Sequence, residues 1–187
     1  MKYESIRLRI RKIYIRSSCK RRRKEINCDD FTIISNNCWG GLIYQSYGLK
    51  YNTPTIGLYF MAEDYIKFVY NIKEYLRYEL KFINYKESKI YKINKQELKF
   101  PVAKLGDIEI YFMHYKSEKE AKEKWKRRTK RINWDKILFK FSNQNFYSEE
   151  HIKNFLDLPA KNKICFVNKN FGIKGTIKIK QLFSQKI

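Results

Sequence analysis

Residues 31–41, with the sequence FTIISNNCWGG, constrain the fold more than any other part of the chain. An apolar, β-branched run at 31–34 stops abruptly at the polar triplet 35–37, and the pair Gly40-Gly41 leads into a second apolar stretch. This order predicts a strand, a tight loop and a helix. Ligands of open α/β sheets bind at such junctions, where helix N-termini present free N–H groups. A plain strand-to-helix turn without a ligand has the same pattern.

Strand and helix patterns alternate through the rest of the chain. Residues 65–83 have apolar side chains at three- and four-residue intervals, which predicts one long amphipathic helix. Ser148 is placed to cap a short helix that Pro159 ends. Three runs read as further strands, residues 53–60, 137–141 and 163–167. The alternation predicts an α/β fold, a single three-layer α/β/α domain with a mostly parallel sheet.

A second, antiparallel element is expected near residues 100–113. Gly106-Asp107 separates two apolar runs, and a two-residue Gly-X connection is typical of a tight β-hairpin. Ser117 and Glu120 have the spacing of a capping box, which predicts that a helix begins there. Residues 88–99 are ambiguous, because the strand-like run at 90–93 lies within a polar stretch.

The charge of the chain is strongly basic and uneven. Forty-one Lys and Arg against 19 Asp and Glu give a net charge of +22, to which residues 1–27 contribute +9. We therefore divide the chain into a basic leader, residues 1–27, and a single α/β domain, residues 28–187. The leader alternates like a strand as far as Ile10, but Ile6, Ile10, Ile13 and Tyr14 would share one face of a helix. Such a basic amphipathic helix could lie on an anionic membrane surface, whereas the alternative is a solvated leader.

The sequence predicts a cytoplasmic location, with peripheral contact at the inner face of the membrane as an option. It has no apolar run of 18 residues and no apolar core of a secretory signal. The four cysteines should then be reduced, and none of them forms a C-x-x-C pair. With only His114 and His151 as imidazoles, we predict no metal site and no cofactor.

Two residues are candidates for catalysis. Cys38 would stand near the start of a helix, where the positive end of the helix dipole lowers the pKa of a thiol and favours a nucleophilic thiolate. His114 follows an apolar strand at the position where α/β sites gather, and it could act as the base. The alternatives are a packing role for Cys38 and a structural histidine. The segment departs from G-x-S-x-G, so a hydrolase nucleophile elbow is not supported.

The remaining candidates are ligand-binding residues. Amides such as those of Asn36 and Asn37 can donate to and accept from sugar hydroxyls, although Asn also suits tight loops. Arginines of the basic helix at 122–131 could bind a diphosphate, although a solvated helix face is the plainer interpretation. The full set of ligand-binding candidates is Ser35, Asn36, Asn37, Trp39, Gly40, Gly41, Lys104, Arg127 and Arg128.

Several segments together resemble a family of uncharacterised bacterial proteins often labelled exopolysaccharide or capsular polysaccharide biosynthesis proteins. The matching stretches include SNNCWGG at 35–41, PTIGL at 54–58, FPVAKL at 100–105, and residues 121–133 with Trp125 and Arg131. The similarity extends from about Asp30 to Val167. It implies a three-layer α/β fold and a role in making surface polysaccharide, and it assigns no reaction.

Three hypotheses of function follow. The leading one is a transferase-like enzyme, of glycosyl or acyl groups, that binds a sugar nucleotide or a lipid-linked saccharide during polysaccharide assembly. The second is a non-catalytic accessory factor of the same assembly. The third and weakest is a nucleic-acid-binding protein, because the charge permits it but no binding module is recognisable. The sequence does not indicate the oligomeric state.

Overall fold

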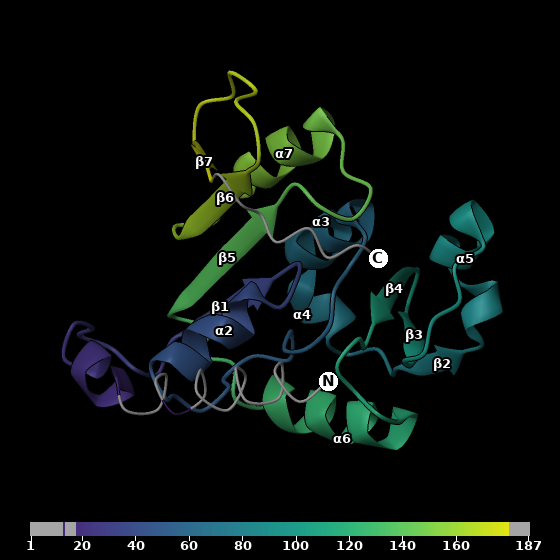
Figure 1. Ribbon diagram of the computed structural model, residues 1–187, viewed down its shortest axis with the longest axis horizontal. Coiled ribbons are helices and arrows are strands. Elements are labelled where there is room, and N and C mark those ends of the chain that lie inside the picture. The colour runs from purple at the N-terminus through teal and green to yellow at the C-terminus, as the bar shows by residue number, and fades with distance from the viewer. Residues whose placement is uncertain (1–12, 14–17, 180–187) are drawn as a thin grey trace.

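The computed structural model describes residue 13 and residues 18–179, and its fold is α/β (Figure 1). Four parallel strands form the larger sheet in the order β1-β5-β6-β7. Their bounds are Thr32–Ser35 for β1, Ile137–Ser142 for β5, Lys163–Val167 for β6 and Thr176–Lys178 for β7. The strand, loop and helix expected at residues 31–41 are thereby confirmed, because α2 (Trp39–Ser46) follows β1 directly.

Helices cover both faces of the parallel sheet. On one face, α2 packs against Ile33 of β1 and Leu138 of β5. On the other, α3 (Ala62–Tyr70) and α7 (Glu149–Leu156) pack against Ile34 and Phe141. Because side chains alternate along a strand, positions 138, 140 and 142 of β5 all point toward α2. The predicted sheet with helices on both faces is confirmed.

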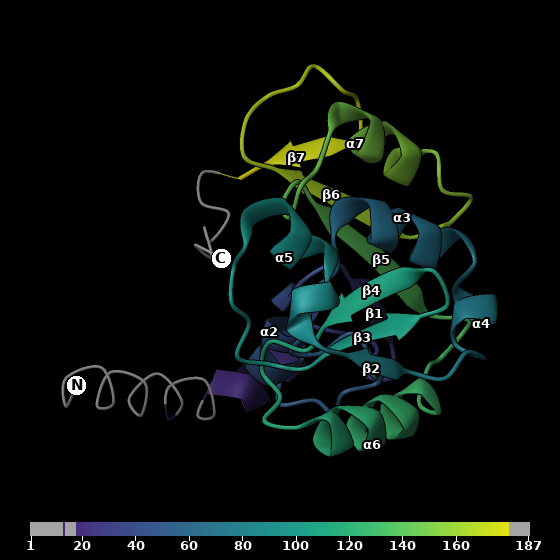
Figure 2. The ribbon, with the colours of Figure 1, turned by 90° about the vertical axis from the view of Figure 1, so that its right-hand side faces the viewer.

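The smaller sheet is antiparallel and contains the predicted hairpin. Its order is β2-β3-β4, with bounds Lys81–Ile83, Val102–Leu105 and Ile108–Tyr111. Gly106 forms the turn with φ +63°, in the left-handed region that favours glycine. In Figure 2 this sheet lies in front of the parallel sheet, and α6 (Glu118–Thr129) runs below it. Ser117 caps α6 as predicted, because its hydroxyl accepts from the N–H of Glu120 at 3.2 Å.

One hydrophobic core connects the two sheets. On α3, Tyr65 stacks on Phe141 of the parallel sheet. Phe68 of the same helix contacts Trp125 of α6, which in turn packs against Phe112 beyond β4. The opposite face of the antiparallel sheet is covered by α5 (Lys89–Asn94) and by the segment before α3. Both sheets therefore pack against the same group of buried side chains, and this packing fixes their relative position.

Two expected elements differ from the structure, and the structure decides one ambiguous segment. The single helix over 65–83 is wrong, because α3 ends at Tyr70 and a short α4 (Ile72–Tyr75) follows a break at Asn71 with φ −126°. Both helices bury apolar residues in the same core, so the periodicity continues across the break. The strand-like run at 90–93 belongs to α5, which follows the 3-10 turn η1 (Tyr85–Glu87) and is capped by Ser88.

The predicted strand at 53–60 is also wrong. This segment makes a single isolated bridge, in which Tyr59 and Tyr111 exchange backbone hydrogen bonds of 3.0 Å. Its apolar residues Ile56, Leu58 and Phe60 are buried as the segment passes between the two sheets. The apolar pattern therefore indicated correctly that this segment is buried, but the segment is not buried as a strand of a sheet.

Most of the basic leader, residues 1–12 and 14–17, lies outside the described residues, so the choice between strand and helix there is not settled. Residues 18–23 are helical. Arg22 donates to the carbonyl of Ser46 at 3.3 Å, and Arg23 donates to the carbonyls of Tyr47, at 2.8 Å, and Gly48. Two cations of the leader therefore satisfy carbonyls at the negative end of α2, where cations are stabilising. Within the described part of the chain, no helix has the length and apolar character to cross a bilayer.

Candidate functional site

Polar side chains gather where β1 and β5 end side by side. Asn36, just beyond β1, donates to the carbonyl of Ser142 at 2.8 Å and accepts from the backbone N–H of Ser142 at 3.1 Å. At the neighbouring ends of β5 and β6, Asn143 Nδ2 donates to Asn168 Oδ1 at 2.8 Å, and Asn143 Oδ1 accepts from the backbone N–H of Asn168 at 3.1 Å. Parallel strands end at a common edge, so this polar cluster occupies the edge at which α/β proteins bind ligands.

Asn37 is the connecting residue of this polar cluster. Its Oδ1 accepts from the backbone N–H of Trp39 at 3.1 Å and from Lys140 at 3.0 Å. Its Nδ2 donates to Ser142 Oγ at 2.9 Å and to Gln144 Oε1 at 2.6 Å. Asn37 is half-buried, whereas Asn36 is fully buried. Asn37 can therefore meet a ligand from solvent, and Asn36 holds the two strand ends together.

Lys140 lies beneath Asn37 and is buried, with 1% of its surface exposed. Its Nζ donates to Ser142 Oγ at 2.9 Å and contacts Asn36 Oδ1 at 3.4 Å, in addition to Asn37. All three acceptors are neutral, and among the described residues no carboxylate forms an ion pair with this lysine. Burial lowers the pKa of Lys140 to about 7, since water no longer solvates the ammonium.

Two aromatic rings cover the ammonium. The centroids of Trp39, at the start of α2, and Phe166, on β6, are 5.5 Å apart with the rings tilted by 60°. Lys140 Nζ lies 5.9 Å from each ring centroid, within the range of a cation–π contact. Both rings are half-buried, so their outer faces reach the surface.

The glycine pair has a packing role. A Cβ on Gly40 would lie 3.1 Å from Ile33 Cγ2, whereas a Cβ on Gly41 would make an ordinary 3.5 Å contact with Ile56. Gly40 is thus required for the close approach of α2 to β1. Both glycines, which were ligand-binding candidates, are buried in this packing.

Alanine substitutions at the two glycines should have opposite effects. Gly40→Ala should destabilise the fold by about 1 kcal/mol or more, because β-branched Ile33 on a buried strand cannot move aside cheaply. Gly41→Ala should stabilise it by up to about 1 kcal/mol through higher helix propensity. Urea denaturation of the two variants beside the wild type measures the difference. Equal effects would mean that the contact with Ile33 does not determine the packing of α2.

Cys38 precedes α2 as its N-cap residue, but the expected activation of its thiol is wrong. Burial raises the pKa of the thiol to about 11, and the nearby Lys140 lowers it only in part. The Sγ atom lies 3.9 Å from the carbonyl oxygen of Leu58. The effect of desolvation therefore exceeds that of the nearby ammonium, and Cys38 is a neutral thiol at physiological pH.

Alkylation provides a direct test of this protonation state. At pH 8 Cys38 should react with iodoacetamide on the order of 100-fold more slowly than free cysteine, because only the thiolate attacks. Cys28, whose thiol donates to Asp30 at the surface, provides the internal comparison. Peptide mass spectrometry over time measures both sites. Labelling of Cys38 as fast as Cys28 would show that its thiol is activated after all.

His114 lies outside the polar cluster. It follows β4, a strand of the antiparallel sheet, and therefore not the carboxyl edge of the parallel sheet where we expected it. Its side chain is exposed, and its backbone N–H donates to the carbonyl of Gly57 at 2.9 Å. Gly57 adjoins Leu58, which contacts Cys38, yet no hydrogen bond joins the two candidate catalytic residues in the described part of the chain.

The basic ligand-binding candidates also lie outside the polar cluster. Lys104 is exposed on β3, and Arg127 is exposed on α6. Arg128 is buried, donates to the hydroxyl of Tyr115 at 2.6 Å and lies over the ring of Tyr51 at 5.0 Å. Arg128 therefore packs α6 against the domain.

Ser35 is buried as well, with its hydroxyl directed to Asn37 at 3.3 Å.

Comparison with known proteins places the chain in a family. The family model described as "Domain of unknown function (DUF1919)" matches residues 9–187. The chain belongs to this family. An "Uncharacterized protein" of Haemophilus influenzae is 34% identical over 149 residues, which are 80% of this chain and 67% of that protein. As a member of the DUF1919 family, the chain shares its α/β domain with uncharacterised proteins, as the sequence suggested.

Sequence reasoning on this DUF1919 protein identified one half of the polar cluster and missed the other. Ser35–Asn37 and Trp39 were candidates, whereas Lys140, Ser142 and Gln144 were not. A signal did exist, because the run 137–142 alternates, and a lysine and a serine share the face of Leu138 in a strand of otherwise apolar character. The general abundance of lysine in the chain obscured it.

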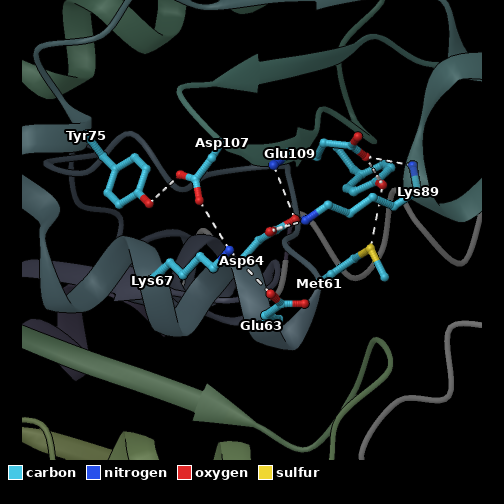
Figure 3. A network of polar contacts seen from close by, with 9 residues as sticks. Met61, Glu63, Asp64, Lys67, Tyr75, Lys89, Asp107 and Glu109 are labelled. Carbon is cyan, nitrogen blue, oxygen red and sulfur yellow. Dashed lines mark hydrogen bonds and ion pairs between the residues drawn. The ribbon is translucent and has the colours of Figure 1, made fainter.

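A second polar network, also missed, joins α3 to the antiparallel sheet (Figure 3). Asp64 of α3 is fully buried and pairs with Lys89 Nζ at 2.5 Å. Its other oxygen accepts from the backbone N–H of Glu109 at 3.2 Å, on the outer edge of β4. Glu109 in turn accepts from the hydroxyl of Tyr111 at 2.6 Å and from the N–H of Lys89 at 2.9 Å. Burial raises the pKa of Asp64, and the contact with Lys89 opposes this rise.

A cavity of about 470 Å³ lies away from both networks, between the antiparallel sheet and the start of α6. Its floor is apolar, with Leu98, Phe100 and Val102, and its rim includes Lys99 and Lys116. No residue of the polar cluster lines it. In the described part of the chain, no three His, Cys, Asp or Glu side chains gather as they would around a metal ion.

Proposed function

We propose that this protein is an enzyme of bacterial surface polysaccharide biosynthesis, exopolysaccharide or capsular, that transfers a group to or from a sugar. Its substrate would be a sugar nucleotide or a lipid-linked saccharide, bound at the carboxyl edge of the parallel sheet. One observation carries the proposal. Asn37, Trp39, Lys140, Ser142 and Gln144 come from two segments far apart in the sequence and meet at that edge.

The chemistry of this polar cluster suits a saccharide joined to a phosphate. The amides of Asn37 and Gln144 can both donate to and accept from sugar hydroxyls. The outer face of Trp39 offers an apolar platform for the C–H face of a sugar ring. Lys140 supplies positive charge without a carboxylate beside it, as a phosphate requires. The resemblance of the SNNCWGG segment to polysaccharide biosynthesis proteins supports the same substrate class.

The proposed location is the cytoplasmic side of the membrane, where lipid-linked saccharides are built. The excess of cations in residues 1–27 supports peripheral contact with an anionic surface. Arg22 and Arg23, however, are engaged with the end of α2. The cations available to a membrane are therefore fewer than the sequence alone suggests.

Complementation tests the proposal. In a strain from which the gene has been deleted, Asn37→Ala and Trp39→Ala should each lower cell-surface polysaccharide at least about tenfold relative to wild type, by loss of sugar contacts. Gln45→Ala is the matched control, because Gln45 is exposed on α2 and its side chain donates to Tyr51 at the surface. Immunoblots establish equal protein levels. Unchanged polysaccharide in both variants would refute the site.

Binding separates the enzyme from the accessory factor. Purified wild-type protein should bind at least one member of a panel of nucleoside diphosphate sugars, measured by saturation-transfer NMR, and Trp39→Ala should not. Loss of polysaccharide in the variants without any such binding by the wild type would favour the non-catalytic accessory factor instead.

A further inference from the structure

Lys140 is a buried cation without a counter-charge. Buried charges in proteins are normally paired, because removing an ion from water costs far more than neutral hydrogen bonds return. Among the other buried charges of the described residues, Asp64 follows the rule, with Lys89 as its partner. Glu109 lies beside the same pair and accepts from the N–H of Lys89, and Arg128, which is 7% exposed, donates to Tyr115. Lys140 contacts, among the described residues, the oxygens of two amides and one hydroxyl and the rings of Trp39 and Phe166, none of which carries a negative charge. The position therefore lacks one negative charge.

Within the described ranges, no group packed around Lys140 can supply that charge. The titratable groups nearest to it are Cys38 before α2, Cys165 on β6 and Tyr65 of α3, whose hydroxyl donates to the carbonyl of Lys140 at 2.9 Å. Burial raises the pKa of both thiols, to about 11 for Cys38 and about 12 for Cys165, and raises that of Tyr65 as well. All three are neutral at physiological pH.

The surroundings of Lys140 leave a route for an anion. The ammonium lies one side chain below the surface, under Asn37, Trp39 and Phe166, which are all half-buried. Of the three residues that supply these acceptors, Asn37 is half-buried and Asn36 and Ser142 are fully buried, so an oxygen of an incoming anion can replace Asn37 Oδ1. The start of α2, with its positive dipole end, adjoins the same position.

We propose that Lys140 is the anion anchor of the polar cluster and binds, as an ammonium, a phosphate oxygen of the saccharide ligand. This inference rests on the proposed function and deepens it, because it assigns the phosphate to one side chain and the sugar to the amides and Trp39. Under this inference, anion binding is coupled to the protonation of Lys140. The bound anion supplies the missing negative charge and thereby retains the proton on Lys140.

Proton linkage gives the sign of the pH dependence. In the free protein burial lowers the pKa of Lys140 to about 7, so the side chain loses its charge as the pH rises above that value. A bound anion favours the ammonium and raises the pKa. Binding therefore takes up a proton above pH 7. The affinity should fall by up to about tenfold per pH unit between the free and the bound pKa.

The experiment uses lysine labelled with ¹³C at Cε and follows the titration of Lys140 by NMR. Lys140→Met identifies the resonance by its absence. Sulfate is the probe, because its charge does not change near neutral pH, so any pH dependence belongs to the protein. Sulfate should raise the titration midpoint of Lys140 by about one unit or more. Chloride at equal ionic strength should not. A midpoint that sulfate leaves unchanged overturns the anchor.

Two variants and a second probe complete the test. Lys140→Arg should bind sulfate without the pH dependence, because its guanidinium stays charged, and Lys140→Met should not bind it. Sulfate binding by Lys140→Met with the wild-type pH profile also overturns the anchor. UDP-glucose is the second probe. If the wild type and Lys140→Met bind it equally at every pH, the anchor is wrong while the proposed function stands. If sulfate behaves as expected and no sugar nucleotide binds, the proposed function fails instead.

Discussion

Lys140→Met is expected to make the protein more stable and inactive at the same time. At pH 7 the free energy of unfolding should rise by on the order of 2–4 kcal/mol, because the buried ammonium costs more than its neutral hydrogen bonds return. Cell-surface polysaccharide should fall to the level of the deletion strain, because the ligand loses its charge partner. Few substitutions in a core separate stability from function in this way.

The hydrogen bonds around Lys140 permit this gain in stability. After the substitution, Asn36 Oδ1 still accepts from the N–H of Ser142, and Asn37 Oδ1 still accepts from the N–H of Trp39. Ser142 Oγ still accepts from Asn37 Nδ2. No buried acceptor is therefore left without a donor, and methionine has nearly the length and shape of the lysine stem.

The pH dependence gives this prediction a second, independent check. The pKa of Lys140 is about 7 in the folded protein, against an ordinary value of 10.5 in the unfolded chain. Between these values the unfolded state binds more protons, so the wild type gains stability as the pH rises. The advantage of Lys140→Met should be complete at and below pH 7 and should disappear toward pH 10.5. Urea denaturation at several pH values measures it, and a variant less stable than wild type at pH 7 would contradict the account.

Asp64→Ala should be the most damaging change in the second polar network. It removes the partner of Lys89 and leaves the N–H of Glu109 unsatisfied on the edge of β4 (Figure 3). We expect a loss of about 2–4 kcal/mol, at the lower side of the range for broken buried ion pairs. The reason for the lower value is that Lys89 is one-third exposed and can turn to solvent. Guanidinium denaturation followed by circular dichroism measures the change.

Glu63→Ala is the matched control for Asp64→Ala. Glu63 is the preceding residue of the same helix, and it is exposed and pairs with Lys67 at 3.3 Å. Exposed pairs of this type contribute little, so its removal should change the stability by less than about 0.5 kcal/mol. Similar losses for the two variants would mean that the edge of β4 does not depend on Asp64.

Local pattern predicted the parallel part of the fold well, for physical reasons. The strands around Ile34, Phe139 and Cys165 have apolar residues on both faces, as is typical of buried parallel strands, and Gly106-Asp107 specifies its own hairpin. The apolar pattern failed as a predictor where a buried segment does not pair with a strand. Residues 53–60 are as apolar as a strand but pass between the sheets, and their neighbours are fixed by long-range packing that a local window does not contain.

The candidate site was predicted in part, for a related reason. The SNNCWGG segment carries its own turn and helix signals, so Asn37 and Trp39 could be placed from sequence. Lys140 and Ser142 lie more than 100 residues later, and only the parallel register of β5 beside β1 brings them together. The thiol of Cys38 was misjudged because a sequence indicates the start of a helix but not the burial that raises the pKa of the thiol.

The most direct test of the account is an NMR titration of the protein with nucleoside diphosphate sugars, observed at the tryptophan indole N–H groups. The chain has three tryptophans, and Trp39→Phe assigns the resonance of interest. We predict saturable shifts of the Trp39 indole and of the Asn37 side-chain amide, with Trp125 and Trp134 unaffected. Shifts confined to residues around the 470 Å³ cavity near α6, or no shifts at all, would contradict the assignment of the carboxyl edge as the binding site.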